Sequence, residues 1–239
     1  MIKNIKNLII QTKIFNYLYF KILKKDLDFP NKLYKSTDEK NKFIHILEAV
    51  NYVKVAKLPP VFFEFGCHSG RTFSTAISSA KYLNLNLECF AFDSFEGLPE
   101  TNEKEDGIFK SGTFFTSKKN FIDIVYKKTK LKISNNQIIQ GYYEKSLTTE
   151  LKSKLPRSVG FIHIDVDLYS STKTVLNFIK DFLKIGTVIL FDDWYCFSPG
   201  SLMGEKKAFT EFLNKNKNIQ VEEWKNYSTF GKSFFVTKI

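Results

Sequence analysis

The sequence predicts an α/β protein built around a mostly parallel β-sheet with helices on both faces. Three observations lead to this prediction. Short apolar runs alternate with segments of helical periodicity from about residue 61 to the C-terminal end. Strands that are separated by helices favour parallel pairing with right-handed crossovers. The 239 residues, of which 43% are hydrophobic, suffice for one α/β domain with a large core but are few for two.

The expected elements follow one another along the chain. Residues 1–37 are expected to form an N-terminal helical appendage closed by Pro30, and residues 38–239 the folded domain. Asp38 can cap the first helix of that domain, which should run to Lys57 and stop at Pro59 and Pro60. The next expected strands are 61–65, 87–92, 137–140, 159–164 and 187–191, and the expected helices are 70–83, 119–128, 171–183 and 205–214. Residues 219–224 and 233–237 should form a hairpin that adds one antiparallel strand.

The composition argues against nucleic acid as a partner. The net charge is +11, and residues 1–60 carry seven of these charges, yet Arg71 and Arg157 are the only arginines. Recognition of phosphates and base edges favours the bidentate fork of arginine over lysine. The 25 phenylalanines are expected to replace leucine as core residues.

The three cysteines, Cys67, Cys89 and Cys196, include no Cys-x-x-Cys pair. This pattern disfavours both a disulfide scaffold and a zinc site, and it fits a reducing compartment. No run approaches the length of a membrane span, and lysines interrupt the apolar N-terminal stretch where a signal peptide would need a continuous core. We therefore expect a cytoplasmic protein.

Residues 1–37 carry apolar side chains at near-helical spacing with lysines between them. We expect this helix to pack on the body of the protein or on a second subunit of a homo-oligomer. A lysine-faced amphipathic helix on a membrane surface is the alternative.

The first candidate site is the glycine loop at residues 64–70, which follows the first strand of the sheet and opens a helix. Ligands of open α/β sheets bind at that edge. Gly66 permits a sharp turn, and Gly70 is expected to let a ligand approach the start of the helix. The loop lacks the middle glycine of a dinucleotide fingerprint and the Gly-Lys-Ser/Thr of a phosphate loop, so neither pyrophosphate nor triphosphate is favoured. His68 is expected to flank the ligand.

Asp93 ends the next strand and is followed by Ser94. An acid at this position commonly accepts hydrogen bonds from the two hydroxyls of a ribose. Together with Glu64, Gly66 and Gly70, Asp93 forms the arrangement expected for an adenosyl ligand.

Two further strands end in pairs of acids. Asp165 and Asp167 follow the strand that ends at Ile164, and Asp192 and Asp193 follow Phe191. Four carboxylates that converge at one edge of a sheet repel one another and raise one another's pKa values. A hard divalent cation with oxygen ligands relieves this repulsion, whereas the absence of soft ligands makes zinc a poor candidate. His163 lies inside its strand and is expected to face the core or a neighbouring helix.

With these sites in hand, the chain resembles the macrocin O-methyltransferase family, whose members methylate sugar hydroxyls. The resemblance runs from about Pro60 to Thr237 and is carried by these segments: Phe92-Asp-Ser-Phe-Glu-Gly-Leu-Pro99, Gly141-Tyr142-Tyr143, His163-Ile-Asp-Val-Asp-Leu-Tyr-Ser-Ser-Thr172 and Phe191-Asp-Asp-Trp194. It implies a Rossmann-like class I methyltransferase fold with a seven-stranded sheet.

The resemblance also implies residue roles. Asp165, Asp192 and Asp193 would hold Mg²⁺, and Asp167 would be the general base. S-adenosylmethionine would lie against the following residues: Glu64, Gly66, Cys67, His68, Gly70, Asp93, Ser94, Gly141 and Asp165. Ser69 departs from the glycine that many relatives carry at its position.

The expected function is therefore Mg²⁺-dependent methylation of a hydroxyl on a sugar or glycosylated metabolite, with a small molecule or glycan as acceptor. A catechol also offers two adjacent oxygens to a metal ion, so it remains an alternative acceptor. A non-catalytic adenosyl-ligand fold that binds nucleic acid or membrane through its basic N-terminus is a second alternative, and a catalytically dead scaffold is a third. The polar loop at 96–116, with Gly107 and Gly112 as hinges, is expected to close over the substrate.

Overall fold

The computed structural model describes residues 29–101, 107–197 and 200–239. The chain divides into two compact units, residues 1–40 and 41–239. The expected appendage falls mostly on residues 1–28, outside the described ranges, so its packing and the boundary at residue 37 remain predictions. Within the described ranges, no helix combines the length and the apolar character needed to cross a membrane.

Helix α2 spans Phe29–Val55, so the expected helix start at Asp38 is wrong. Pro30 was expected to close the preceding segment, but it lies in the first turn of α2. A proline is tolerated there because the first amide groups of a helix have no intrahelical acceptor, and its fixed φ suits the helix. The helix ends close to the expected residue, ahead of Pro59 and Pro60.

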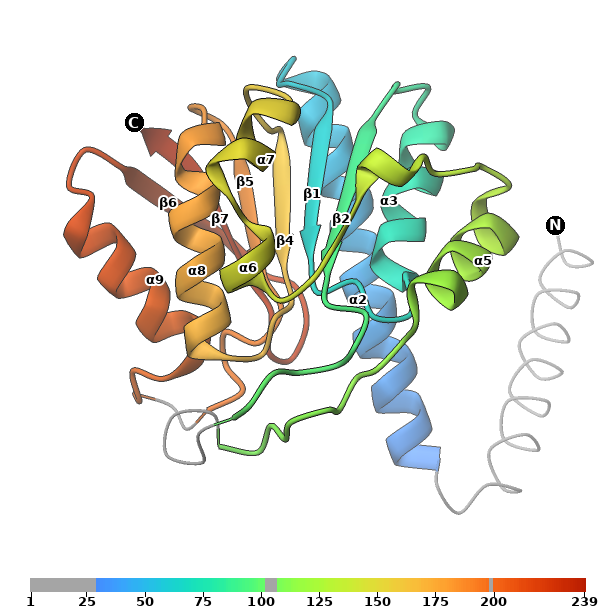
Figure 1. Ribbon diagram of the computed structural model, residues 1–239, viewed down its shortest axis with the longest axis horizontal. Coiled ribbons are helices and arrows are strands. Elements are labelled where there is room, and N and C mark those ends of the chain that lie inside the picture. The colour runs from blue at the N-terminus through green and yellow to red at the C-terminus, as the bar shows by residue number, and fades with distance from the viewer. Residues whose placement is uncertain (1–28, 102–106, 198–199) are drawn as a thin grey trace, which may run out of the picture. The chain divides into compact units, whose positions relative to one another are not determined.

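All seven expected strands are present and form one sheet in the order β3-β2-β1-β4-β5-β7-β6 (Figure 1). Strands β1 to β5 are parallel, whereas β7 runs antiparallel to both of its neighbours. The predicted mostly parallel sheet with an antiparallel C-terminal strand is thus confirmed. The strands are β1 (Val61–Phe65), β2 (Glu88–Asp93), β3 (Ile138–Gln140), β4 (Phe161–Ile164), β5 (Val188–Phe191), β6 (Gln220–Asn226) and β7 (Lys232–Lys238).

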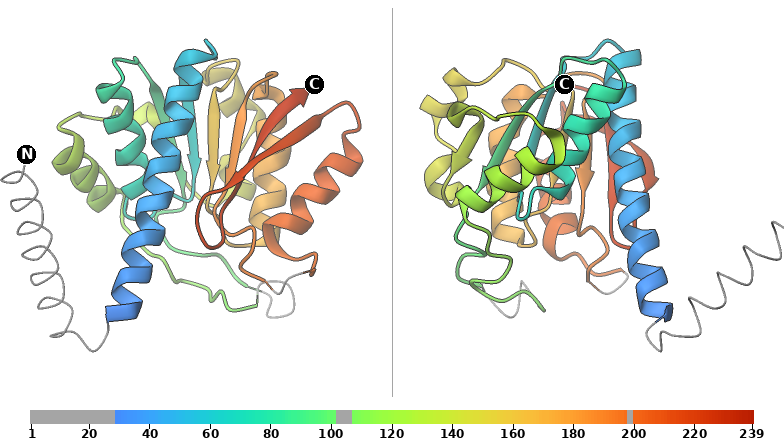
Figure 2. Two further views of the ribbon diagram at one scale, coloured as in Figure 1. Left: turned by 180° about the vertical axis from the view of Figure 1, so that it is seen from behind. Right: turned by 90° about the vertical axis from the view of Figure 1, so that its right-hand side faces the viewer.

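Helices cover both faces of the sheet, as expected (Figure 2). One face packs against α3 (Arg71–Tyr82), α5 (Lys118–Thr129) and the part of α2 from residue 41 onwards. The other face packs against α8 (Tyr169–Ile179) and α9 (Gly204–Lys215), with α6 (Tyr143–Ser146) and α7 (Thr149–Lys154) beside them. Two 3₁₀ turns complete the fold, η1 (Asn135–Gln137) and η2 (Lys180–Phe182).

Phenylalanine supplies most of the largest fully buried side chains, which confirms its expected role in the core. Because strand side chains alternate between faces, neighbouring residues enter opposite cores. Phe62 stacks on Phe161 with ring centroids 4.2 Å apart on the α2 face, and Phe65 stacks on Phe92 at 4.4 Å on the α8 face.

The sequence did not predict α6 and α7, which have four and six residues. Helices this short show too little periodicity to be recognised from an apolar pattern. The local chemistry nevertheless supports α7, because the hydroxyl of Thr148 caps it by accepting a hydrogen bond from the Leu151 N–H.

Candidate active site

The candidate site lies where β1, β2, β4 and β5 end, at the lower edge of the sheet in Figure 1. The parallel strands all point their carboxyl ends toward this edge, and the loops that follow them carry the acids and glycines singled out in the sequence. This common direction explains how residues distant in sequence come together.

Gly66 begins the turn between β1 and α3 with a φ of 81°. Its N–H donates to the carbonyl of Phe92 at 3.0 Å, which ties the turn to the end of β2. A Cβ at this position would lie 1.7 Å from the carbonyl oxygen of Asp165. Glycine is therefore required both by the backbone conformation and by the close approach of the chain after β4.

Gly70 precedes α3 with a φ of 64°. The space that a Cβ would occupy here is filled by the side chains of Val125 and Phe121, at 2.9 and 3.0 Å, and the approach of a ligand to this glycine stays a prediction. The glycine therefore serves the left-handed conformation and the packing of α3 against α5.

The carboxylate of Asp93 organises the glycine loop. Its Oδ2 accepts hydrogen bonds from the N–H groups of Cys67 (2.7 Å) and His68 (3.0 Å), and its Oδ1 accepts one from Phe95 (2.7 Å). A carboxylate oxygen has two lone pairs, so Oδ2 is saturated while Oδ1 has room for one further donor. In this structure Asp93 therefore has one free acceptor position, on Oδ1, for a ribose hydroxyl, whereas hydrogen bonds from two hydroxyls were expected.

Three other residues expected to bind the cofactor lie around this loop. The hydroxyl of Ser94 donates to the carbonyl of Gly97 at 2.8 Å and thereby closes the turn after β2. Gly141, with a φ of 130°, donates its N–H to the Asp93 carbonyl at 3.0 Å. His68 packs edge-on against Phe114 with ring centroids 6.1 Å apart, and burial lowers its pKa.

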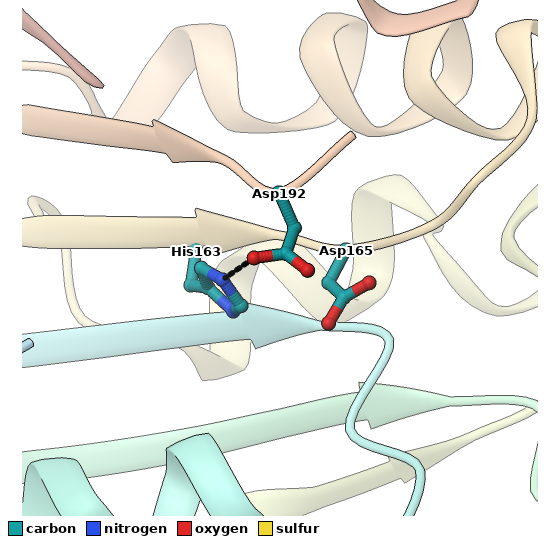
Figure 3. A group of neighbouring side chains, drawn as sticks. All are labelled: His163, Asp165 and Asp192. Carbon is teal, nitrogen blue, oxygen red and sulfur yellow. Dashed lines mark ion pairs between the residues drawn. The ribbon is translucent and has the colours of Figure 1, made fainter. Parts of the chain in front are cut away.

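The structure brings the four predicted acids together, and it adds a histidine to them. Ligand atoms of His163, Asp165 and Asp192 lie within 4.8 Å of one another (Figure 3). The same limit holds for Asp165, Asp167 and Asp193. Asp165 belongs to both groups, so the two groups form one continuous carboxylate cluster.

A chain of alternating charges runs from this cluster back under the glycine loop. Lys42 of α2 forms an ion pair with Oδ2 of Asp192, whose Oδ1 lies 3.6 Å from Nε2 of His163. Nδ1 of His163 lies 3.7 Å from the carboxylate of Glu64, which is 1% exposed. Glu64 therefore faces His163 beneath the loop.

The cluster shifts the pKa values of its members. Burial lowers the pKa of His163, but Asp192 and Glu64 outweigh it and raise that pKa to about 10. Burial would raise the pKa of Asp192, yet His163 and Lys42 hold it below its usual range. Burial and neighbouring carboxylates raise the pKa of Asp167 to about 10 and that of Asp193 to about 6. Negative charge is thus compensated at Asp192 and uncompensated at Asp167 and Asp193.

The sequence did not single out several residues that surround the cluster. Glu205, at the start of α9, is fully buried and accepts a hydrogen bond from the N–H of Asp193 at 2.9 Å. Burial raises the pKa of Glu205. The thiol of Cys196 lies 2.8 Å from Oδ1 of Asp193, and the hydroxyl of Tyr227 lies 3.4 Å from Oδ1 of Asp192. No motif could have revealed these contacts, because the residues come from separate loops and helices.

The donor set fits a hard divalent cation. All four acids offer carboxylate oxygens, and Oδ2 of Asp193 is buried without a hydrogen-bond partner. A buried carboxylate oxygen without a partner is costly unless a proton or a cation satisfies it. Oxygen ligands of this kind suit Mg²⁺.

The model of the macrocin-O-methyltransferase (TylF) family matches residues 19–223 of the chain. No curated protein sequence matches the chain.

Several solved structures are similar. The O-methyltransferase NovP superposes with a TM-score of 0.66 at 19% identity, covering 83% of this chain and 80% of its own. Apo CalS11, described as a TDP-rhamnose 3'-O-methyltransferase of calicheamicin biosynthesis, gives 0.60 at 18% identity, covering 90% of both chains. An O-methyltransferase from Bacillus cereus in complex with SAH gives 0.51 at 14% identity, covering 84% and 81%. At these identities the likeness establishes the class I methyltransferase fold.

Proposed function

Because the chain belongs to the macrocin O-methyltransferase family and is an O-methyltransferase, we propose that it transfers a methyl group from S-adenosylmethionine to a sugar hydroxyl with Mg²⁺ bound to its acids. The acceptor is a free or glycosidically linked sugar of a small molecule or glycan. The carboxylate cluster at the carboxyl edge of the sheet, next to the glycine loop, is the observation that carries this proposal.

The glycine loop and the ends of β2 and β3 hold the cofactor in this proposal. When bound, S-adenosylmethionine would supply a methyl group on a sulfonium sulfur, and the sulfur would leave with the electron pair of the broken bond as the neutral thioether S-adenosylhomocysteine. Asp93 offers Oδ1 to a ribose hydroxyl and fixes the N–H groups of Cys67 and His68 with Oδ2. Gly141, bonded to the Asp93 carbonyl, keeps the end of β3 close to this carboxylate. The contact of Gly66 with Asp165 sets the distance between the cofactor loop and the acids.

The acids hold the metal ion and the acceptor. Asp165, Asp192 and Asp193 are the proposed ligands, and the ion supplies positive charge that makes an acceptor hydroxyl more acidic. Asp192 is oriented by ion pairs with Lys42 and His163, and Asp193 through its N–H by Glu205. These contacts fix the direction of the ligands before the ion binds.

Asp167 is the proposed general base. It has a φ of 60°, an uncommon conformation for a residue other than glycine, and this geometry turns the chain after β4. Its carboxyl group is near those of Asp165 and Asp193, within the cluster. A cation bound to the neighbouring acids would lower the raised pKa of Asp167, and the resulting carboxylate would take the proton of the acceptor hydroxyl.

Two measurements test the proposal. Calorimetric titration with S-adenosylhomocysteine, with Mg²⁺ and then with EDTA, should show one-to-one binding in both conditions. Methyl transfer to sugar acceptors, including a nucleotide sugar, should require Mg²⁺ and be lost with EDTA. Absence of binding in both conditions would overturn the cofactor assignment, and transfer to a catechol but to no sugar would overturn the acceptor class.

A further inference from the structure

We propose that Lys42 is an internal counter-cation of the metal site, which holds Asp192 when no divalent ion is bound and competes with that ion for its carboxylate. This inference rests on the proposed function, because it assumes that Asp192 is a metal ligand. It assigns a positioning role to a residue on α2, far from every motif in the sequence.

The burial of the ion pair is the first argument. Lys42 and Asp192 are 150 positions apart, and their side chains are 22% and 11% exposed. The other lysine–carboxylate pairs within the described ranges each have at least one partner that is 39% exposed or more. Exposed pairs contribute little to stability, whereas charges removed from water need a partner. The burial of this pair therefore indicates a local need for positive charge.

The imbalance of charge around the cluster is the second argument. Six carboxyl groups gather here, those of Glu64, Asp165, Asp167, Asp192, Asp193 and Glu205. Within the part of the chain that the structure describes, Lys42 and His163 are the cationic side chains that form ion pairs with them. His163 is shared between Glu64 and Asp192, so Lys42 is the cation that pairs with Asp192 alone.

The remaining contacts of Asp192 decide the direction of the effect. Its Oδ1 lies 3.6 Å from Nε2 of His163 and 3.4 Å from the Tyr227 hydroxyl, which donates to the Phe191 carbonyl at 2.8 Å, so the ion pair with His163 remains if Lys42 is removed. Removal of Lys42 therefore deletes a repulsive charge without freeing the ligand. Even at the dielectric constant of water, a unit charge about 6 Å from a divalent ion raises Kd roughly tenfold.

The experiment measures metal affinity, not turnover. Mn²⁺ binding to the full chain is followed by electron paramagnetic resonance, and Mg²⁺ binding by competition, for the wild type and for Lys42→Met, Lys42→Gln and Lys42→Arg. Lys40→Met is the matched control, because Lys40 is an exposed lysine two positions earlier on the same helix. Melting temperatures are recorded for each protein in EDTA and in saturating Mg²⁺.

We expect both neutral variants to bind Mn²⁺ about tenfold more tightly and to melt at a lower temperature in EDTA, with the difference closed by Mg²⁺. Lys42→Arg and Lys40→Met should match the wild type. Equal or weaker Mn²⁺ binding by the neutral variants overturns the role of Lys42, as does a loss of folding that Mg²⁺ does not reverse.

Failure of the proposed function gives a different result. If the wild type binds no divalent ion, the metal site itself is refuted, and Lys42 is then a structural partner of Asp192. If the wild type binds Mn²⁺ but transfers no methyl group to sugars, the proposal of a sugar acceptor is refuted. The comparison of Mn²⁺ affinities among the Lys42 variants still tests the role of Lys42.

Discussion

Gly66 lies directly against Asp165, since a Cβ on Gly66 would come within 1.7 Å of the Asp165 carbonyl oxygen. The first residue after β1 thus packs backbone to backbone on the first residue after β4. The glycine loop and the carboxylate cluster therefore meet at one edge of the sheet, and in the proposed function this contact would set the distance between the methyl donor and the acceptor hydroxyl. Alignment of this kind supplies much of the rate of a transfer reaction.

We predict that Gly66→Ala reduces the free energy of unfolding by about 4 kcal/mol or more, because the new methyl group meets a backbone carbonyl that has no room to move. Gly112→Ala is the matched control. Gly112 has a similar φ of 73° but nothing within 4 Å of its Cβ position, so only the backbone strain of about 1 kcal/mol applies. Urea denaturation measures both values, and equal losses would contradict the proposed contact.

We predict that Asp167→Asn lowers turnover by roughly a hundredfold or more while leaving affinity for S-adenosylhomocysteine nearly unchanged. Asparagine tolerates the left-handed conformation of this position, so the substitution removes the proton-accepting carboxyl group and keeps the backbone. Asp123→Asn, on the exposed side of α5, controls for the loss of one negative charge. Stronger loss of cofactor binding than of turnover would contradict the role of general base.

We predict that Glu205→Ala reduces the free energy of unfolding by about 2–3 kcal/mol, because it leaves the partly buried N–H of Asp193 without an acceptor and opens a cavity at the fully buried Glu205. Glu205→Gln keeps the acceptor oxygen and the volume, so its loss should stay below about 1 kcal/mol. Thermal and urea denaturation in EDTA give both values. A loss from Glu205→Gln as large as that from Glu205→Ala would show that the charge matters and the hydrogen bond does not.

Sequence patterns predicted the sheet well because its strands are short apolar runs bounded by glycine, proline and acids. The sequence pattern predicted that the N-terminal segment ends at Pro30 and that the next helix begins at Asp38. The start of α2 was therefore predicted wrongly, because this helix contains both residues. Local signals of this kind are weak where a proline falls in the first turn of a helix.

The residues of the site that lie at the ends of strands were predictable from the sequence. Asp93, Asp165, Asp167, Asp192 and Asp193 each end or follow a parallel strand, and the topology alone brings them to one edge. The partners of these acids were not predictable, because Lys42 and Glu205 approach from helices whose packing a single sequence does not encode in any local pattern. The packing of α5 against the Cβ position of Gly70 was not predictable for the same reason.

His45 provides a further prediction, on the pH dependence of stability. Its ring is 1% exposed and lies between Trp224 and Tyr227, with centroids 4.6 and 4.7 Å away. Nδ1 lies 3.0 Å from Glu48 and Nε2 lies 2.9 Å from the Ser233 hydroxyl. The Ser233 hydroxyl in turn donates to the Lys225 carbonyl at 3.1 Å, so each ring nitrogen has one polar neighbour within hydrogen-bond distance.

Burial, with a smaller contribution from the positive charge of Lys225, lowers the pKa of His45 from 6.5 to about 4, although Glu48 opposes the shift. The unfolded chain therefore binds a proton at pH 5 that the folded chain does not. Stability from this group is fully present above pH 6.5 and is lost as the pH falls toward 4, by at most about 3 kcal/mol. Lys225 of β6 also forms an ion pair with Glu48 of α2, so the two charged neighbours of His45 interact with each other as well as with the ring.

We predict that the free energy of unfolding, measured by urea denaturation in EDTA, falls between pH 7 and pH 5 more steeply in the wild type than in His45→Gln. Glutamine lacks a group that titrates in this range, and the change in slope isolates His45 from carboxylates that both proteins share. The variant is expected to be less stable at pH 7, because it loses the stacking on Trp224 and Tyr227. An equally steep fall in His45→Gln would place the proton uptake on another group.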